Sequence, residues 1–464
     1  MSSTADVILY GGSIITMDEK NPSAEALAVT GNIITAVGKL DEVFALAGET
    51  TKVIYLNQKT LLPGFIEPHT HATALVLVNT AYTNISGYDY HTYNDVNEKM
   101  KETIRKLDTE TSPLPWALFF GWDPELIPSL PLLSADFLDK VFSSEVPVVV
   151  VGQSGHVAWV NRKAFEVANV DDSIENADGG VFVKDDEGHL TGQLFEVYAI
   201  ERVTSYAPQP TLSDLQTKIK DQWKDFASRG FTTVTEMAYQ RNPAFDTLLL
   251  KESEQRDCPI RLALYQVVYG PENSIKEEKS STRSHYQCCP SLLRIDDSMD
   301  GSLDQDEPII EGSDKLWVAG VKVIADGSPH CGTAAVQEPY LNSNLTEILG
   351  FPESPQYGTL NYTTDELLEI VQSYHKKGTQ IAIHAHGERA IDQVLTVYEQ
   401  VVSKVPKDTR HRIEHLGLAT VDTIARAGEL KLALSFFVCH LYFYAKSFTE
   451  YIFGRERTDL NRDD

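Results

Sequence analysis

From residue 61 onward, short apolar runs of strand length alternate with amphipathic stretches of helical length, such as 212–227, 365–376 and 390–402. Parallel neighbouring strands need a crossover connection, which is usually a helix, so this alternation is typical of βαβ units. It predicts an α/β fold, a TIM-like (βα)8 barrel in which seven strands are recognisable and the eighth is missing. The expected strands are 62–71, 232–237, 260–268, 316–326, 380–386, 412–416 and 432–437.

Three stretches depart from this alternation. Residues 1–60 hold short strands separated by turns, and we expect them to form the N-terminal part of a small β-sandwich. Within the barrel domain of 61–464, residues 72–206 are too long for a loop and contain strands of their own, so they predict an inserted α+β subdomain between strands one and two. Residues 277–314 are polar and acidic and predict an irregular surface insertion.

The chain is strongly acidic. It carries 40 Lys and Arg against 67 Asp and Glu, a formal net charge of −27. This charge repels a phosphate backbone and an anionic membrane surface, so we expect neither nucleic acid nor a membrane as a partner. The N-terminus has no signal-peptide pattern, and no run approaches the roughly 20 apolar residues of a membrane span, so a cytoplasmic location is the default expectation.

Two histidines, His69 and His71, close the first predicted barrel strand. Alternate side chains of a strand point to the same face, so both imidazoles are expected to face the barrel interior at its C-terminal mouth, where active sites of such barrels lie. Two neutral imidazoles there can chelate a divalent metal ion. An isolated pair of this kind would more often be one buried and one surface histidine that share a strand by chance.

Other residues at strand ends favour the metal site. His384 and His415 close two further predicted strands, and imidazoles from three strands converge only if those strands form a barrel. Four independent core histidines are the less consistent alternative, because buried polar groups need partners. Lys322 lies in the middle of an apolar strand, where an ammonium group is costly unless it is neutralised or paired. Taken alone, Lys322 fits an ion-paired residue equally well.

The order of these residues along the chain, His69 and His71, then Lys322, then His384, then His415, resembles that of the binuclear members of the amidohydrolase superfamily. Those proteins carry His-x-His on the first strand, Lys on the fourth, and His on the fifth and sixth. The similarity is closer still to amidohydrolase family 3, which includes N-substituted formamide deformylase-like proteins. The matching stretches are LPGFIEPHTH (62–71), GHVAWVN (155–161), GQLFE (192–196), VKVIADG (321–327), HAHGERAID (384–392) and RIEH (412–415).

The resemblance implies hydrolysis of a non-peptide carbon–nitrogen bond, in an amide, a formamide or a related small molecule, by attack of a metal-bound hydroxide. It implies that the metal is divalent, with one or two ions and zinc as the default, although iron, manganese or nickel would suit the same ligands. It also implies that carbon dioxide carboxylates Lys322 into an anion that bridges two metals. The implied metal ligands are His69, His71, Lys322, His384 and His415.

The sequence departs from the family pattern after the seventh strand. Members supply an Asp at the end of an eighth strand, but Asp463 and Asp464 lie in a charged tail with no apolar run before them. We therefore assign no catalytic residue and expect the chain to be C-terminally truncated relative to the family. The alternative function is a truncated, catalytically silent metal-binding homologue, whose barrel survives through a partner or as a homodimer.

Three more residues are predicted to contact substrate or to orient the site. His156 follows a Val-rich strand of the insertion, His440 follows the seventh barrel strand, and Asp326 ends the strand that carries Lys322. The structural alternatives are a turn residue without a role for His156, a rim residue with satisfied hydrogen bonds for His440, and a capping residue for Asp326. We expect His386 to support the ligands or to touch substrate. No role is assigned to His91, His189, His285, His330 and His375.

Overall fold

The computed structural model describes residues 4–107, 115–176, 180–271, 313–351 and 354–459. Contacts divide the chain into two compact units, Met1–Ile66 with Arg229–Thr233, and Glu67–Ser228 with Val234–Asp464. The predicted acidic insertion at 277–314 lies almost entirely outside the described residues, as does His285. In the part of the chain that is described, no helix combines the length and the apolar character needed to cross a membrane.

The smaller unit contains a five-stranded sheet in the order β3-β2-β1-β4, with β5 also paired to β1. Ile8, Ala26, Ala28 and Val43 form its small core, and Val43 comes from helix α1 (Leu40–Phe44). That this sheet is half of a sandwich stays a prediction. The strands are β1 (Val7–Ile15), β2 (Ser23–Thr30), β3 (Ile33–Gly38), β4 (Lys52–Tyr55) and β5 (Thr60–Leu61).

Seven strands form the barrel sheet, in the order β18-β17-β16-β15-β14-β13-β6. Neighbouring strands from β14 to β18 pair in parallel. These strands confirm the predicted parallel α/β barrel with seven strands. The observed strand ends differ from the predicted ones by up to three residues. The strands are β6 (Phe65–Thr70), β13 (Phe231–Tyr239), β14 (Arg261–Val267), β15 (Leu316–Ile324), β16 (Gln380–Ala385), β17 (Arg412–His415) and β18 (Ala433–Phe436).

Side chains bring the two edges of this sheet together, so that the barrel is nearly closed. Arg412 on β17 donates a hydrogen bond from Nη2 to the Pro68 carbonyl on β6 at 2.9 Å. The His69 ring packs against Phe437, just beyond β18, with ring centroids 5.0 Å apart. Among the described residues, no eighth strand pairs with β18 and β6.

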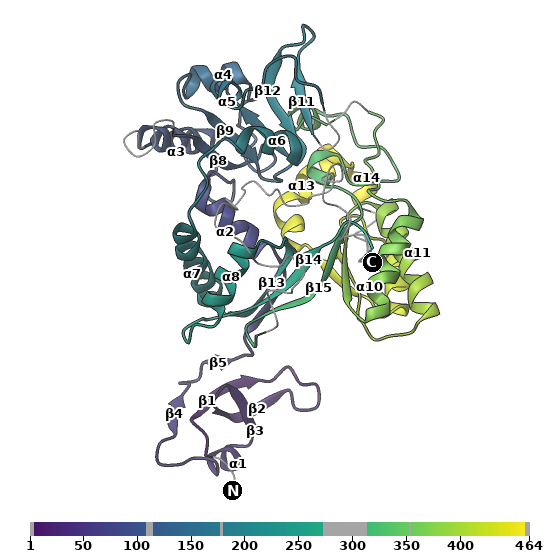
Figure 1. Cartoon of the computed structure of the whole chain (residues 1–464). Helices are drawn as coiled ribbons and strands as arrows, with labels where there is room; N and C mark the ends of the chain where they lie inside the picture. Colours follow the sequence, from purple (N-terminus) through teal and green to yellow (C-terminus); the bar gives the residue numbers. More distant parts are fainter. Residues whose placement is uncertain (1–3, 108–114, 177–179, 272–312, 352–353, 460–464) are drawn as a thin grey trace. The chain divides into compact units, whose positions relative to one another are not determined.

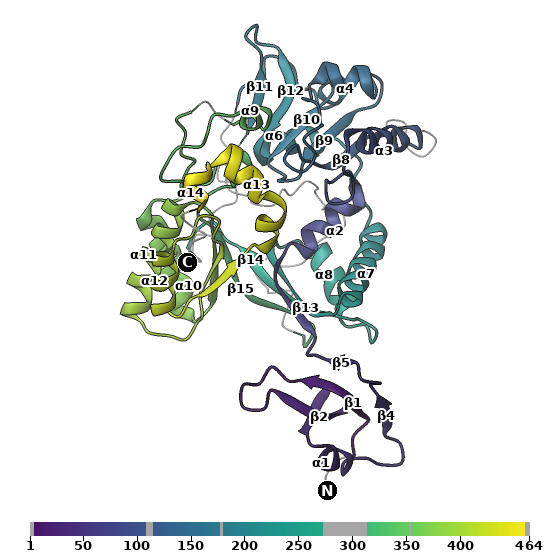
Figure 2. The same cartoon turned by 180° about the vertical axis from the view of Figure 1, so that it is seen from behind.

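Helices cover the outside of the barrel, as Figures 1 and 2 show for α10, α11 and α12 on one side and α7 and α8 on another. In the main core, Ile391, Val394 and Leu395 of α11 pack with Ile381 and Ile383 of β16. The apolar positions of the amphipathic pattern that predicts α11 are therefore the positions that contact the sheet. The helices are α7 (Leu212–Ser228), α8 (Pro243–Ser253), α10 (Thr364–Lys377), α11 (Glu388–Lys404) and α12 (Val421–Glu429).

Between β6 and β13 the chain forms a second sheet of six strands, in the order β11-β12-β10-β9-β8-β7. All six lie within 72–206, where an inserted subdomain is expected, and β9 and β10 are fully buried. The strands are β7 (Thr83–Asn84), β8 (Ala117–Trp122), β9 (Val148–Gly152), β10 (Val157–Val160), β11 (Val181–Lys184) and β12 (Leu190–Phe195). The helices are α2 (Ala72–Ala81), α3 (Tyr93–Arg105), α4 (Ala135–Val141), α5 (Arg162–Val167) and α6 (Glu196–Thr204).

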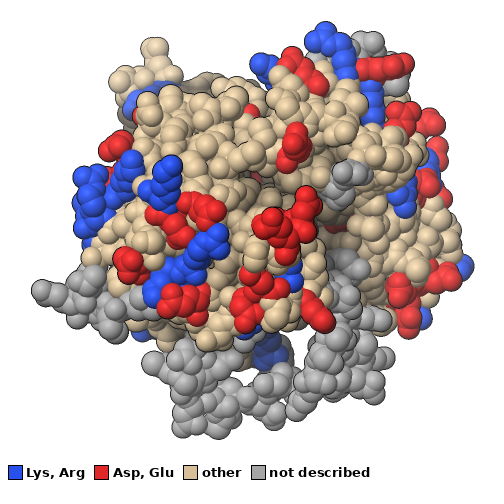
Figure 3. Space-filling model, turned by 90° about the horizontal axis from the view of Figure 1, so that it is seen from above, with Lys and Arg blue, Asp and Glu red and all other residues tan. Residues whose placement is uncertain are grey.

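Short helical segments follow the last barrel strand. Ile452 and Phe453 pack there in a separate small core with Val336, Tyr340 and other residues. The segments are η3 (His440–Tyr444), α13 (Ala445–Ser447), η4 (Phe448–Ile452) and α14 (Arg455–Asp459), and earlier ones are η2 (Pro329–Cys331) and α9 (Asn344–Ile348). Figure 3 shows one face of the molecule, on which acidic groups lie between basic ones.

Candidate metal centre

The C-terminal ends of β6, β16 and β17 bring four predicted histidines together. The ring centroids of His69 and His415 are 4.6 Å apart, and those of His384 and His415 are 4.5 Å apart. The His71 ring lies 5.6 Å from that of His69. Residues that are more than 340 positions apart in the sequence therefore share one site, because the parallel strands end at the same rim.

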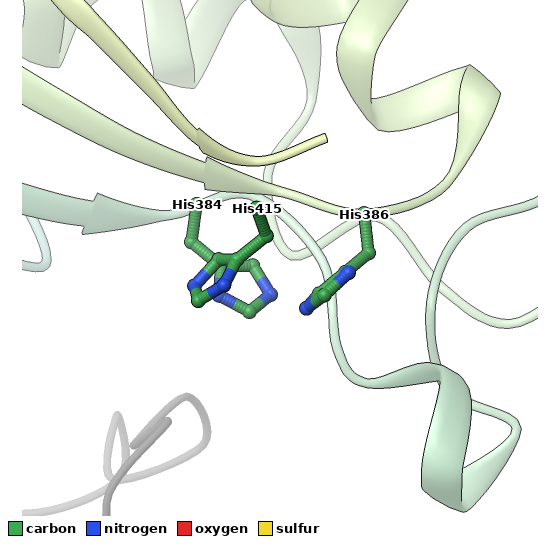
Figure 4. A group of neighbouring side chains, drawn as sticks. All are labelled: His384, His386 and His415. Atoms are coloured by element: carbon green, nitrogen blue, oxygen red, sulfur yellow. The ribbon is translucent and has the colours of Figure 1, made fainter. Parts of the chain in front are cut away.

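His386 joins this cluster more closely than the sequence indicates. Its ring lies 4.9 Å from that of His384 and 4.5 Å from that of His415. Ligand nitrogens of His384, His386 and His415 all lie within 4.8 Å of one another, close enough to hold a metal ion. Figure 4 shows the three side chains on the same side of the strands.

The buried histidines have nitrogen atoms without hydrogen-bond partners among the described residues. His69 binds the Glu414 carboxylate through Nδ1 at 2.6 Å, which leaves Nε2 unpartnered. His384 donates from Nε2 to the Gly327 carbonyl at 2.9 Å, which leaves Nδ1 unpartnered. Both ring nitrogens of His415 lack a partner. Buried polar atoms are normally satisfied, so these lone pairs fit the donor set of a metal ion.

Two imidazoles of the cluster, those of His69 and His415, are held in their neutral form. Burial and the charge of Lys322 lower the pKa of His69 to about 3. Burial and the neighbouring His384 lower the pKa of His415 well below its usual value. Neutral imidazole is the form that offers a lone pair to a metal.

Lys322 lies within β15, beside Ala382 of β16, and is fully buried. Its Nζ atom has no hydrogen-bond partner in the part of the chain that is described. A buried ammonium group without a partner costs several kcal/mol in principle. The environment of Lys322 therefore fits an unmodified, charged lysine poorly.

Glu414 is a buried carboxylate that the sequence analysis missed. Arg412 donates to it from Nε at 2.6 Å and from Nη2 at 3.1 Å, and it also binds His69. Burial alone would raise the pKa of Glu414, but the His69 hydrogen bond and the charge of Lys322 lower it to about 2. The carboxylate stays ionised and fixes the ring of His69.

Glu236 is the corresponding carboxylate beside His71, and it was also missed. It accepts hydrogen bonds from the amide and hydroxyl of Thr73 and from the Ala238 amide, and its Oε1 lies 3.6 Å from His71 Nδ1. The signal that could have found both residues is a lone acidic residue inside a predicted buried strand, in FTTVTEMAY and in RIEH.

Asp326 lies beneath the site rather than on its surface. It is fully buried and accepts hydrogen bonds from the amides of Ala335, His386 and Gly387. Its Oδ1 is also 3.5 Å from His384 Nε2. These contacts fit the expected orienting role, and that role and the expected contact with substrate both stay predictions.

The histidine cluster opens into a cavity of about 370 Å³. His156 and His440, both predicted to contact substrate, line it, and His156 Nδ1 is bonded to Glu196 at 2.8 Å. Apolar side chains such as Leu75, Trp122 and Trp159 form much of the remaining wall. A concave, largely apolar space with a few convergent polar groups is typical of small-molecule sites.

His330, which was given no role, also lines this cavity. Its Nδ1 is bonded to Glu125 at 2.7 Å, and Glu125 comes from the inserted subdomain. The two residues are 205 positions apart in the sequence, and nothing in either local pattern indicates that they meet.

Three comparisons relate this chain to known proteins. The model of the amidohydrolase family, in its branch 3, matches residues 52–461. Among curated proteins, the chain is 26% identical over 456 residues to Protein LONG AFTER FAR-RED 3 of Arabidopsis thaliana, which covers 98% of this chain and 71% of that one. It is 22% identical to the N-substituted formamide deformylase of Arthrobacter pascens, over 94% of this chain and 73% of that one.

Solved structures show the same fold. An uncharacterized metal-dependent hydrolase from Pyrococcus horikoshii superposes with a TM-score of 0.64 at 21% identity, over 98% of this chain and 79% of that one. The family model covers far more than half of the sequence, and the motifs that predict the histidine cluster lie inside the match. The chain therefore belongs to the amidohydrolase family.

Proposed function

We propose that this protein is a metal-dependent hydrolase that cleaves a non-peptide carbon–nitrogen bond of a small molecule. The observation that carries the proposal is the set of buried imidazole nitrogens on His69, His384 and His415 that lie at one end of the barrel and have no partner among the described residues. A hydrolytic enzyme is also what family membership indicates.

The residues that would hold the metal are His69 through Nε2, His384 through Nδ1, and His415, with His71 and Lys322 completing the set. Imidazole nitrogens are good ligands for zinc, which is our first choice of metal. A divalent cation bound there would lower the pKa of a water molecule and would polarise the substrate carbonyl.

The protein orients these ligands through fixed hydrogen bonds. Glu414 holds the Nδ1–H of His69, and the Gly327 carbonyl holds the Nε2–H of His384. Each contact sets the tautomer, so that the opposite nitrogen presents its lone pair to the site. The ligands are therefore arranged before any metal arrives.

Lys322 is proposed to be carboxylated. Its fully buried Nζ atom lacks a partner among the described residues, and conversion to a carbamate would replace an unpaired cation by an anionic metal ligand. Incubation with carbon-13 bicarbonate should give a carbamate signal in the carbon-13 NMR spectrum. Lys322→Arg should lack that signal. If the wild-type protein also lacks the carbamate signal, this part of the proposal is wrong.

The cavity wall supports a small substrate with an apolar part. Trp122, Trp159 and Leu75 exclude water from one side, while His156 and His440 offer polar contacts near the cluster. Exclusion of water strengthens electrostatic interactions at the reacting group. The name of one relative, N-substituted formamide deformylase, favours formamides and amides as the first compounds to assay.

The proposal is tested by measuring the metal content and the turnover of the same purified protein. Purified protein should contain a divalent metal by elemental analysis, and it should release amine from a panel of N-substituted formamides and amides. His384→Ala should lose metal and at least about a hundredfold in activity, whereas His91→Ala at an exposed loop position should lose neither. Bound metal without turnover on any compound would instead support a catalytically silent homologue.

A further inference from the structure

A second group of ionisable side chains lines the cavity that the histidine cluster opens into. It consists of Asp123, Glu125, His330 and Tyr444. Asp123 and Glu125 lie just beyond β8 of the inserted subdomain, and the other two follow β15 and β18 of the barrel. None of the four belongs to the proposed metal ligands.

Glu125 has one carboxylate oxygen that nothing satisfies among the described residues. Its side chain is only 2% exposed, and its Oε1 is bonded to His330 Nδ1 at 2.7 Å. Its Oε2 is buried and has no hydrogen-bond partner. A buried carboxylate oxygen without a donor is costly, so its place in the wall of a cavity indicates a donor that arrives with a ligand.

Both carboxylate oxygens of Asp123, by contrast, already accept hydrogen bonds. One oxygen accepts hydrogen bonds from the amides of Glu125 at 2.8 Å and Leu126 at 3.3 Å. The other accepts from the Tyr444 hydroxyl at 2.9 Å. Asp123 therefore shapes the turn that carries Glu125, and it adds negative charge without an open acceptor.

The charge of this group favours a cation. Burial opposes protonation of His330, but the neighbouring Glu125 outweighs it and raises the pKa of the imidazole. Burial and the charge of Glu125 raise the pKa of Asp123 to about 6. The group thus places two carboxyl groups beside one imidazole, in a space whose low-dielectric walls favour a positively charged ligand over an anionic one.

A molecule that reaches from this group to the histidine cluster would pass along an apolar wall. The His440 ring lies 5.3 Å from that of His330 and 5.4 Å from that of His386, so one residue separates the two groups. Trp122 and Trp159 line the same cavity. The cavity therefore has a metal-binding part, an apolar part and an anionic part.

We propose that Glu125 is a specificity-determining residue that binds a primary ammonium group at the end of the substrate away from the scissile bond. This inference rests on the proposed function and names its substrate class, which is amides or formamides that carry an amino group on an apolar chain. Glu125 Oε2 accepts a hydrogen bond from the ammonium group, and His330 holds the carboxylate in place through Oε1.

The experiment compares N-(aminoalkyl)formamides of increasing chain length with their N-alkyl counterparts, by titration calorimetry on metal-loaded protein. Binding gives a transient heat and turnover gives a continuous one, so the two are read separately. At the best chain length, the amino compound should bind at least about tenfold more tightly than its counterpart, because a charge-assisted hydrogen bond in a buried site is strong.

Glu125→Gln should abolish that preference, and its effect on the N-alkyl compounds should be small. Glu429→Gln, the same change at an exposed position on α12, should keep the preference. Equal binding of the two series by the wild-type protein would overturn the inference, as would a preference that survives in Glu125→Gln. Preferential binding without any continuous heat would support the ammonium site and contradict the proposed hydrolysis instead.

Discussion

Glu414 carries a negative charge between Arg412 and His69. It accepts hydrogen bonds from Arg412 and from His69. A neutral side chain of the same shape could still accept from His69, but it would leave the partly buried Arg412 guanidinium beside an uncharged group.

We therefore expect Glu414→Gln to weaken metal binding by about 10- to 100-fold and to lower the free energy of unfolding by about 3 kcal/mol. Competition with a chromogenic chelator measures the first effect, and urea unfolding of the metal-free protein measures the second. Glu429→Gln is the matched control, because Glu429 is exposed. Unchanged metal affinity would show that Glu414 does not position His69.

The sequence predicted the histidines of the site better than the carboxylates. His69, His384 and His415 stand at the ends of apolar runs, so strand periodicity alone places them at one rim. Glu236 and Glu414 stand inside such runs, where an acidic residue is recognisable as unusual but its partner is not. Glu125 and His330 lie in loops, and their contact depends on how the inserted subdomain meets the barrel.

At the scale of elements, α11 is the helix that contributes most to the main core. Ile391 is fully buried there with residues of β16, whereas Ile424 on the neighbouring α12 is 43% exposed. Ile391→Ala should lower the free energy of unfolding by about 2–5 kcal/mol, through lost burial and the cavity that remains. Ile424→Ala should change it by less than about 0.5 kcal/mol. Urea unfolding of both variants measures the difference, and equal effects would contradict this packing.

A chain of hydrogen bonds ties α10 to the start of β17. His411 Nδ1 accepts from the Ile381 amide at 3.1 Å, its Nε2 bonds to His375 Nδ1 at 2.8 Å, and His375 Nε2 donates to the Val405 carbonyl at 2.7 Å. Since Nδ1 of His411 is an acceptor, protonation would set a donor against the Ile381 amide. Burial and the neighbouring His375 accordingly lower the pKa of His411 to about 3.

This arrangement predicts a loss of stability in acid. The unfolded chain takes up a proton at His411 near its ordinary pKa of 6.5, whereas the folded chain does so only near 3. The stability that neutral His411 contributes is complete above about pH 6.5 and falls between these values by up to about 1.4 kcal/mol per pH unit. Metal-free His411→Gln should show a shallower decline between about pH 7.5 and 5 in urea unfolding. His91→Gln, at an exposed position, should decline like the wild type.

Element types were more predictable than element ends. All seven barrel strands were expected, because each is an apolar run between amphipathic stretches. The expected strands 62–71 and 316–326 extend beyond the observed β6 and β15. Leu62 to Gly64 continue the apolar pattern without joining β6. Ala325 still donates a backbone hydrogen bond to His384 of β16, but Asp326 bridges Leu360 instead. The order of strands in the inserted sheet follows from long-range packing and could not be read from local patterns.

At the scale of the whole molecule, the histidine cluster joins the two edges of the barrel sheet, which do not pair with each other among the described residues. His69 belongs to β6 at one edge of the sheet, and His384 and His415 belong to β16 and β17 near the other. A metal held by all three would cross-link these edges, beside the contacts that His69 makes with Glu414 and Phe437. Metal binding and barrel closure should therefore be coupled.

Removal of the metal should consequently lower the stability of the whole barrel. An ion that binds only the folded state, present at about 100 times its dissociation constant, adds about 2.7 kcal/mol, which for a chain of this size corresponds to a Tm shift of about 3 °C. Calorimetry before and after chelation should show this loss, and added zinc should reverse it. A variant with both His384→Ala and His415→Ala should not respond to either treatment, because two of the three cross-linking imidazoles are gone. A chelator response in that variant would mean that the stabilising ion binds elsewhere, whereas an unresponsive wild-type barrel would mean that its edges are held by the side-chain contacts alone.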